Sequence, residues 1–326
     1  MNSQRLIVVI GMPRSGTTWI GKIFDSHPDT IYRHEPDSHG GLKGVALAPS
    51  VENVAYYASA IKQFVESLPT LRTGRVAAKG PVFAKSYYDP LRLAMRRAAV
   101  ATAGVGVRLS RHYAVPDFID PKLAITLPLV WKSIASVPRL GVLARALPEA
   151  SFVHVVRHPC GYVASRLKER TLASKGWALQ AIDSDNYDLL RPLLDTNAAQ
   201  RRGLTLRDLR ELSPVERLAW CWSVSVEKAL EDSDGLSNCK TVLYEDICRQ
   251  PMEMARRMFS FAGLNWNGQT EEFVDASTTR DIPAFHSVFK HPMLSANRWQ
   301  QQLTNTSIDR VLAVVSRTRA GNLYAS

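Results

Sequence analysis

Apolar residues form five short runs along the chain, and each run stops abruptly at polar or turn residues. Residues 6–10 read LIVVI and break into a glycine-bounded turn, and residues 151–156 read SFVHVV before a charged pair. Shorter runs lie at 30–34, 127–132 and 241–247. Brief apolar runs bounded by turn signals are typical of strands that are buried on both faces. We therefore predict five strands.

Between these runs the apolar positions take up helical spacing. Residues 20–25, 137–146, 161–170 and 252–261 each follow a predicted strand, and residues 215–230 keep one apolar face over four turns. Strands that alternate with helices imply right-handed crossovers and a parallel sheet covered on both faces. We predict an α/β fold in one domain over residues 1–326.

Two segments do not follow this alternation. Residues 37–120 mix helical stretches with breaks rich in glycine and proline, and residues 175–214 are polar and broken. Loops and helices over the ligand edge of a sheet usually carry substrate specificity. We expect a variable substrate-binding region at 37–120 and a flap at 175–214.

Composition narrows the class of protein. No apolar run approaches the roughly 18 to 20 residues that span a bilayer, and only five residues precede the first strand. A cytoplasmic protein without a transmembrane segment is the expectation, with peripheral membrane contact still possible. The net charge of +11 favours anionic partners, but no motif points to nucleic acid. No zinc or disulfide pattern joins the four cysteines, Cys160, Cys221, Cys239 and Cys248.

The turn after the first strand has the pattern of a phosphate-binding loop. Gly11 and Gly16 have the spacing of a nucleoside-triphosphate P-loop, but Thr17 stands where that motif requires lysine. A cation lies within the loop instead, as Arg14. Free backbone N–H groups and the helix dipole at the start of the next helix favour an anion there. A glycine turn that merely joins strand to helix is the alternative.

A second candidate anion site follows the strand at 151–156. Arg157 stands at the strand end, and Ser165 follows eight residues later, about two turns into the predicted helix. A guanidinium fork and a hydroxyl in this arrangement can meet over one anion. The alternative is an arginine that caps helix ends and a serine that faces water.

Together these two blocks resemble the sulfotransferases that use 3′-phosphoadenosine 5′-phosphosulfate (PAPS). The strand, PRSGTTW and the helix resemble the 5′-phosphosulfate loop of that family, which implies donor contacts from Arg14, Ser15, Gly16, Thr17 and Thr18. Arg157 and Ser165 match the pair that binds the 3′-phosphate. The resemblance implies a three-layer P-loop-like fold and no metal, and it covers scattered blocks between residues 6 and 305.

The resemblance also implies catalytic residues. Lys132 lies 25 residues before Arg157, where many cytosolic members keep a catalytic lysine, but Ile134 replaces the histidine base that follows it there. Carbohydrate sulfotransferases commonly offer a glutamate after the first helix, so Glu35 is the first candidate base and His34 the second. Pro36 is expected to hold Glu35 in an extended conformation.

Three further positions are carried over from the family. Tyr244 would lie against the adenine, and Trp19 would stack on its other face. Near the end of the chain, SANRWQQQLT resembles the segment that closes the donor site, so Arg298 would add a cation to the 3′-phosphate. Lys290 or His291 could serve in its place.

The sequence therefore predicts a sulfotransferase that moves the sulfuryl group of PAPS to a hydroxyl, with a carbohydrate or glycolipid as the favoured acceptor. Small alcohols, phenols and peptide tyrosines fit the same pattern. The alternatives are a P-loop kinase and a non-catalytic nucleotide-binding protein. The kinase is disfavoured because the loop lacks the lysine that the P-loop motif requires. The oligomeric state has no signature in the sequence.

Overall fold

The computed structural model describes residues 4–109, 113–174, 187–280, 288–289 and 291–325. Its centre is a sheet of five parallel strands in the order β2-β3-β1-β4-β5. The strands are β1 (Leu6–Gly11), β2 (Ile31–His34), β3 (Leu129–Ser133), β4 (Ser151–Val156) and β5 (Cys239–Leu243). The predicted α/β class and the parallel sheet are confirmed.

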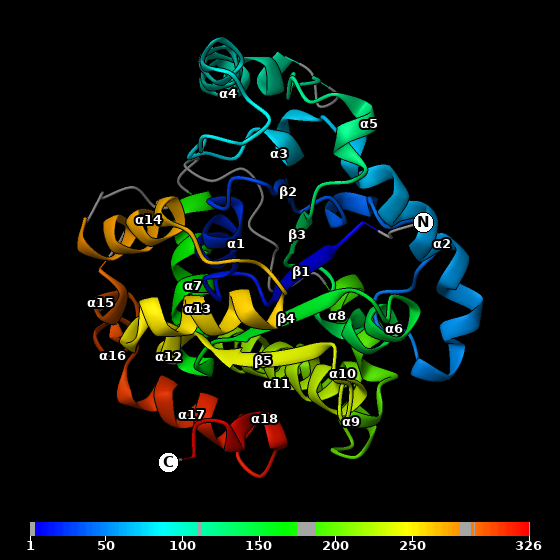
Figure 1. Ribbon diagram of the computed structural model, residues 1–326. Helices are drawn as coiled ribbons and strands as arrows, with labels where there is room; N and C mark the ends of the chain where they lie inside the picture. The colour runs from blue at the N-terminus through cyan, green and yellow to red at the C-terminus, as the bar shows by residue number, and fades with distance from the viewer. Residues whose placement is uncertain (1–3, 110–112, 175–186, 281–287, 290, 326) are drawn as a thin grey trace.

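Helices cover both faces of this sheet (Figure 1). Those in the first half of the chain are α1 (Thr17–Asp25), α2 (Val54–Ser67), α3 (Gly74–Ala77), α4 (Pro90–Leu109), α5 (Pro121–Ala124), α6 (Leu140–Ala146) and α7 (Pro159–Ser174). Next come α8 (Tyr187–Leu194), α9 (Asn197–Gln200), α10 (Leu206–Glu211), α11 (Pro214–Asp232), α12 (Tyr244–Arg249) and α13 (Pro251–Phe261). The last are α14 (Gly268–Thr279), α15 (Pro292–Asn297), α16 (Trp299–Gln302), α17 (Asn305–Val315) and α18 (Arg319–Asn322).

The alternation of side chains along β1 divides the core in two. Val8 and Ile10 pack with residues of α2, α6, α7, α11 and α17, whereas Ile7 and Val9 pack with residues of α1, α12, α13 and α14. Successive strand residues point to opposite faces, so a strand that is apolar throughout needs helices on both sides. This requirement explains why LIVVI lies at the centre of the sheet.

One predicted strand is too long. The run at 241–247 was expected to stay extended to Asp246, but β5 ends at Leu243 and Tyr244 begins α12. Glu245 and Asp246 fall in the first turn of that helix, where the positive end of the helix dipole favours carboxylates. Glu245 and Asp246 are therefore typical of a helix start, although the apolar residues before them suggested that the strand continued.

The structure describes the segment at 37–120 more completely than the segment at 175–214. Residues 37–120 hold α2, α3 and α4, and Figure 1 shows α3 and α4 gathered beyond β2. Of the expected flap, residues 175–186 lie outside the described residues, while α8 and α9 pack against α11 and α10 packs against α8, with leucines and alanines buried between them. The flap and the specificity role stay predictions. Among the described helices, none combines the length and apolar character needed to cross a membrane.

Strand β4 buries an ionisable group, His154. Its Nδ1 lies 3.4 Å from the Thr241 hydroxyl, and its Nε2 has no hydrogen-bond partner within the described part of the chain. Burial lowers the pKa of His154 from 6.5 to about 4. In the unfolded chain this histidine would take up a proton near pH 6.5, which the folded protein resists.

We expect the free energy of unfolding to fall as the pH drops from about 6.5 to 4, because only the unfolded state binds the proton in that window. A shift of this size corresponds to about 3 kcal/mol. His154→Val should flatten this dependence in urea unfolding measured at several pH values. An unchanged slope in the variant would show that His154 is not the responsible group.

Candidate active site

A cavity of about 870 Å³ lies at the carboxyl edge of the sheet. All five strands lead into it, through the loop after β1, His34 of β2, Lys132 of β3, Arg157 after β4 and Tyr244 after β5. In open α/β sheets ligands bind at this edge, where the strand order reverses. Here β1 lies between β3 and β4, so the reversal falls beside the glycine turn. The volume is that of a typical small-molecule site.

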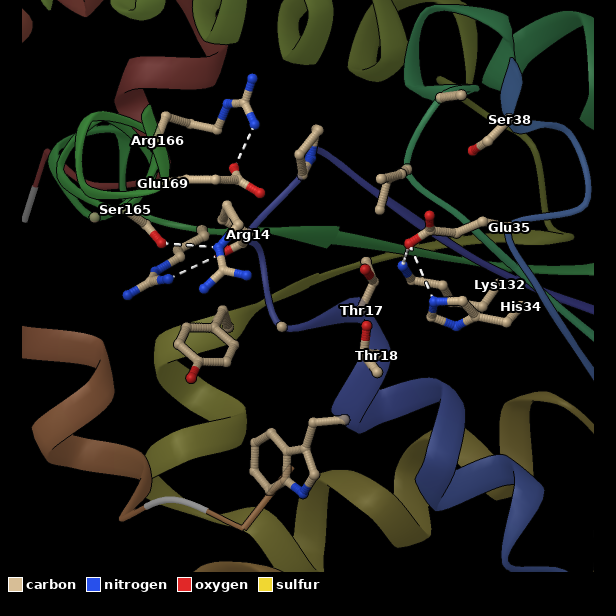
Figure 2. A pocket seen from close by; sticks show the side chains of 18 of the residues that line it. Arg14, Thr17, Thr18, His34, Glu35, Ser38, Lys132, Ser165, Arg166 and Glu169 are labelled. Atoms are coloured by element: carbon tan, nitrogen blue, oxygen red, sulfur yellow. Dashed lines mark hydrogen bonds and ion pairs between the residues drawn. The ribbon is translucent and has the colours of Figure 1, made fainter. Parts of the chain in front are cut away.

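The turn between β1 and α1 is shaped by Gly16. Its φ is +82°, and a Cβ at this position would lie 2.3 Å from a ring carbon of Tyr244. Only glycine fits both the backbone conformation and the close approach of the ring. Thr17 then begins α1, and Figure 2 shows the side chains of Thr17 and Thr18 at the centre of the cavity. Ser15 is fully buried and does not line the cavity.

Arg14 connects the loop to α7. Its Nε donates to the Ser165 hydroxyl at 3.0 Å, and its backbone has a positive φ of 69°. Burial lowers the pKa of Arg14, and Arg157 lowers it further, while Glu169 raises it. On this side of the cavity Figure 2 shows Arg14, Ser165, Arg166 and Glu169 together. The result is an end of the cavity lined by Arg14, Arg157 and Arg166, with Glu169 paired to Arg166.

Arg157 contacts the backbone of Arg14. Its two Nη atoms donate to the carbonyl oxygens of Arg14 at 2.8 Å and Ser295 at 2.7 Å, and its guanidinium lies 4.9 Å from the centre of the Tyr244 ring. The Nε is buried and has no partner among the described residues. A Cβ at Gly161 would lie 2.9 Å from this Nε, so the glycine keeps the space beside it open.

At the other end of the cavity Glu35 meets two basic side chains (Figure 2). The ammonium of Lys132, which is only 1% exposed, forms an ion pair with Glu35 Oε1, and His34 Nε2 lies 3.4 Å from the same oxygen. Burial lowers the pKa of Lys132, and Glu35 raises it. Tyr32 contacts His34 Nδ1 through its hydroxyl at 2.8 Å. The candidate base and the candidate lysine are thus in direct contact.

The prediction that Pro36 holds Glu35 in an extended conformation is wrong. The φ of Glu35 is +51°, in the left-handed region, even though Pro36 follows. The Glu35 N–H continues the β2–β3 ladder by donating to the Lys132 carbonyl at 2.8 Å, and the chain turns at once, with Ser38 N donating back to Glu35. A glutamate in this region costs roughly 1 kcal/mol or more.

Asp37 holds the turn after β2 against β3 through hydrogen bonds. Its buried carboxylate accepts hydrogen bonds from Trp131 Nε1 at 3.1 Å and from the hydroxyls of Ser133 and Ser136 at 2.5 Å each. These donors belong to β3 and the loop after it, so Asp37 ties the β2 turn to the strand that carries Lys132. Sequence reasoning missed Asp37, although its position two residues after Glu35 was a signal.

The rings of Trp19 and Tyr244 are not parallel to each other. Trp19 and Tyr244 have ring centres 6.4 Å apart and planes at 83°, and Trp19 Nε1 donates to the Ser277 hydroxyl. Both rings line the cavity. Their roles at an adenine stay predictions.

The C-terminal segment supports the same edge. Arg298 lines the cavity, His291 caps α15, and Lys290 lies outside the described residues. Tyr324 donates from its hydroxyl to the Val156 carbonyl at 3.1 Å and to Glu245 at 3.0 Å. Glu245 in turn accepts from the His158 backbone N–H. The strand end that carries Arg157 is therefore held from both sides.

Further charged residues of the cavity carried no sequence signal beyond their charge. Lys79 and Arg139 line it near Glu35, and Arg166 and Glu169 form an ion pair of 2.5 Å near Arg14. Lys79 belongs to a stretch that the sequence marked only as a glycine-proline break.

Comparison with known proteins decides the family. The profile of the sulfotransferase family matches residues 7–208, well over half of the chain. The chain belongs to the sulfotransferase family. Within the described residues, the matched span contains β1 to β4 and every site residue named above up to Glu169.

Relatives in this family are distant. Human carbohydrate sulfotransferase 3 is 24% identical over 333 residues, covering 91% of this chain and 62% of that protein. Mouse carbohydrate sulfotransferase 2 is 23% identical over 343 residues, covering 95% and 63%. The chain thus spans somewhat less than two thirds of the length of these relatives. Among solved structures, mouse sulfotransferase SULT7A1 complexed with PAP aligns with a TM-score of 0.46, 10% identity, and coverage of 98% of this chain and 87% of that one.

We expect Gly16→Ala to lower the free energy of unfolding by about 2 kcal/mol, because a Cβ strains the positive φ and meets the Tyr244 ring. Gly268→Ala is the matched control, since its Cβ would meet nothing within 4 Å. Denaturant unfolding of both variants measures the difference. Equal stability of the two would contradict the packing of Tyr244 on the loop.

Proposed function

We propose that this sulfotransferase-family protein transfers the sulfuryl group of PAPS to a hydroxyl acceptor, with a carbohydrate or glycolipid as the acceptor class. The observation that carries the proposal is that one cavity holds both a cationic loop around Arg14 and Arg157 and a carboxylate, Glu35, in contact with Lys132. Family membership supports the reaction. The printed names of the relatives support the acceptor class.

The cationic end fits a nucleotide with several phosphates. The N–H groups at the start of α1 would hold the 5′-phosphate, and the unpartnered Nε of Arg157 would donate to the 3′-phosphate. When bound, PAPS supplies an activated sulfuryl group on a good leaving group. Arg14 and the loop amides would balance the charge that develops on that leaving group.

Glu35 is suited to take the proton of the acceptor hydroxyl. Glu35 lines the cavity with 20% of its side chain exposed, whereas Lys132 beside it is buried. When Nδ1 of His34 accepts from Tyr32, Nε2 carries the proton and faces Glu35 as a donor. In this arrangement His34 orients the carboxylate and Glu35 is the general base.

We expect Arg157→Ala to weaken binding of 3′-phosphoadenosine 5′-phosphate (PAP) by about 2 to 5 kcal/mol, because a buried charge loses its partner. Adenosine 5′-phosphosulfate, which lacks the 3′-phosphate, should lose far less. Calorimetry with both ligands measures this, with the exposed Arg207→Ala as the control. Equal losses for the two ligands, or wild-type protein that prefers ATP with Mg²⁺ to PAP, would contradict the proposal.

We expect Glu35→Gln to keep donor affinity while kcat falls by roughly 10² to 10⁴, the usual contribution of a general base. His34→Ala should cost much less. Steady-state rates with labelled donor measure both variants. Normal turnover of Glu35→Gln with a dead His34→Ala would reverse the roles, and two active variants would move the base into residues 37–120.

The acceptor class is tested by screening with labelled PAPS. Oligosaccharides and glycolipids with free hydroxyls should accept label in preference to phenols, small alcohols and tyrosine peptides. Labelling confined to phenols would leave the sulfuryl transfer intact and overturn the carbohydrate assignment.

A further inference from the structure

Lys132, which stands where many cytosolic sulfotransferases keep a catalytic lysine, already has a carboxylate partner. Lys132 is buried and its ammonium is paired with Glu35, so its charge is balanced by that carboxylate. Arg14 extends toward Ser165, away from Glu35 (Figure 2). The space between the phosphate loop and the carboxylate therefore needs another positive group if a sulfuryl group is to be held there.

Lys79 lies at this place. It lines the cavity, and it interacts electrostatically with Glu35 and Arg14 and also with Lys132. Burial lowers the pKa of Lys79, Glu35 raises it and Arg14 lowers it. Its ammonium has no hydrogen bond or ion pair with any of the described residues. An ammonium in this position can donate hydrogen bonds to an anion that enters the cavity.

The backbone of Lys79 is held in place by a buried charge cluster. Lys22 of α1 donates to the Lys79 carbonyl at 2.9 Å and pairs with Asp25 at 2.5 Å. Lys85 pairs with the same carboxylate at 3.0 Å. The ring of Phe83 lies 5.2 Å from the Lys22 ammonium. The backbone of Lys79 and the residues that follow it are thus fixed to α1, while the Lys79 side chain lines the cavity.

We propose that Lys79 binds the non-bridging oxygens of the sulfuryl group that is being transferred. This inference rests on the proposed function. In the reaction the bond between sulfur and the donor oxygen breaks, a bond from sulfur to the acceptor oxygen forms, and the acceptor proton passes to Glu35. Lys79 transfers no proton. It donates hydrogen bonds to oxygens that PAPS carries and PAP lacks, which separates its role from that of Arg157.

The test compares PAPS and PAP as ligands of the whole chain. Calorimetry at low temperature should show that Lys79→Met weakens PAPS binding by about tenfold or more and changes PAP binding by less than about threefold. Single-turnover release of sulfate to water, which needs no identified acceptor, should slow by roughly 10² or more. Lys43→Met removes an exposed lysine outside the cavity and is the matched control. Lys79→Arg should recover part of the preference for PAPS.

Each other outcome overturns the assignment. Equal weakening of PAPS binding and PAP binding would show that Lys79 binds a phosphate of the donor. A raised KM for acidic acceptors alone would show that Lys79 binds an acidic group of the acceptor. Unchanged binding and turnover would remove it from the site. If Lys79→Met melts early, Lys79→Gln carries the same comparison. Wild-type protein that binds neither ligand would instead contradict the proposed function.

Discussion

The parallel direction of all five strands is the constraint from which the site follows. Parallel strands need crossover helices and burial on both faces, and they bring every carboxyl end to one edge. Residues separated by up to 233 positions, from Gly11 to Tyr244, meet there because each lies in the last two residues of a strand or directly after one. Reversing any one of these strands would remove its residue from the cavity.

Within that edge, charge is divided between two ends with different partners. At the Arg14 and Arg157 end the guanidiniums donate to the hydroxyl of Ser165 and to backbone carbonyls, and Glu169 lies on the same side of the cavity. The Glu35 end contains a carboxylate between Lys132 and His34, and Asp37 fixes its turn to β3. Under the proposed function, a polyanionic donor would be attracted to the first end and proton transfer would take place at the second.

The parts of the fold and site that the sequence predicted are those with local signals. The strand at β1, the glycine turn and the spacing of Arg157 and Ser165 lie within short segments, so pattern alone locates them. The left-handed backbone of Glu35 depends on a ladder bond to β3, and the helix at Tyr244 depends on a dipole that competes with apolar alternation. Lys79 lines the cavity next to a buried cluster of Lys22, Asp25 and Lys85, and no spacing in the sequence predicts these contacts.

Tyr324 has a consequence for the order in which the protein acquires its structure. Its hydroxyl supports the Val156 carbonyl from 168 positions away, next to the strand end that carries Arg157. During synthesis, β1 and its loop are made long before Tyr324, so the Arg157 end of the cavity lacks this support until Tyr324 has been added. Contacts of such long range are formed late and slow the folding of a domain. A nascent chain would therefore hold a collapsed sheet well before it holds a binding site.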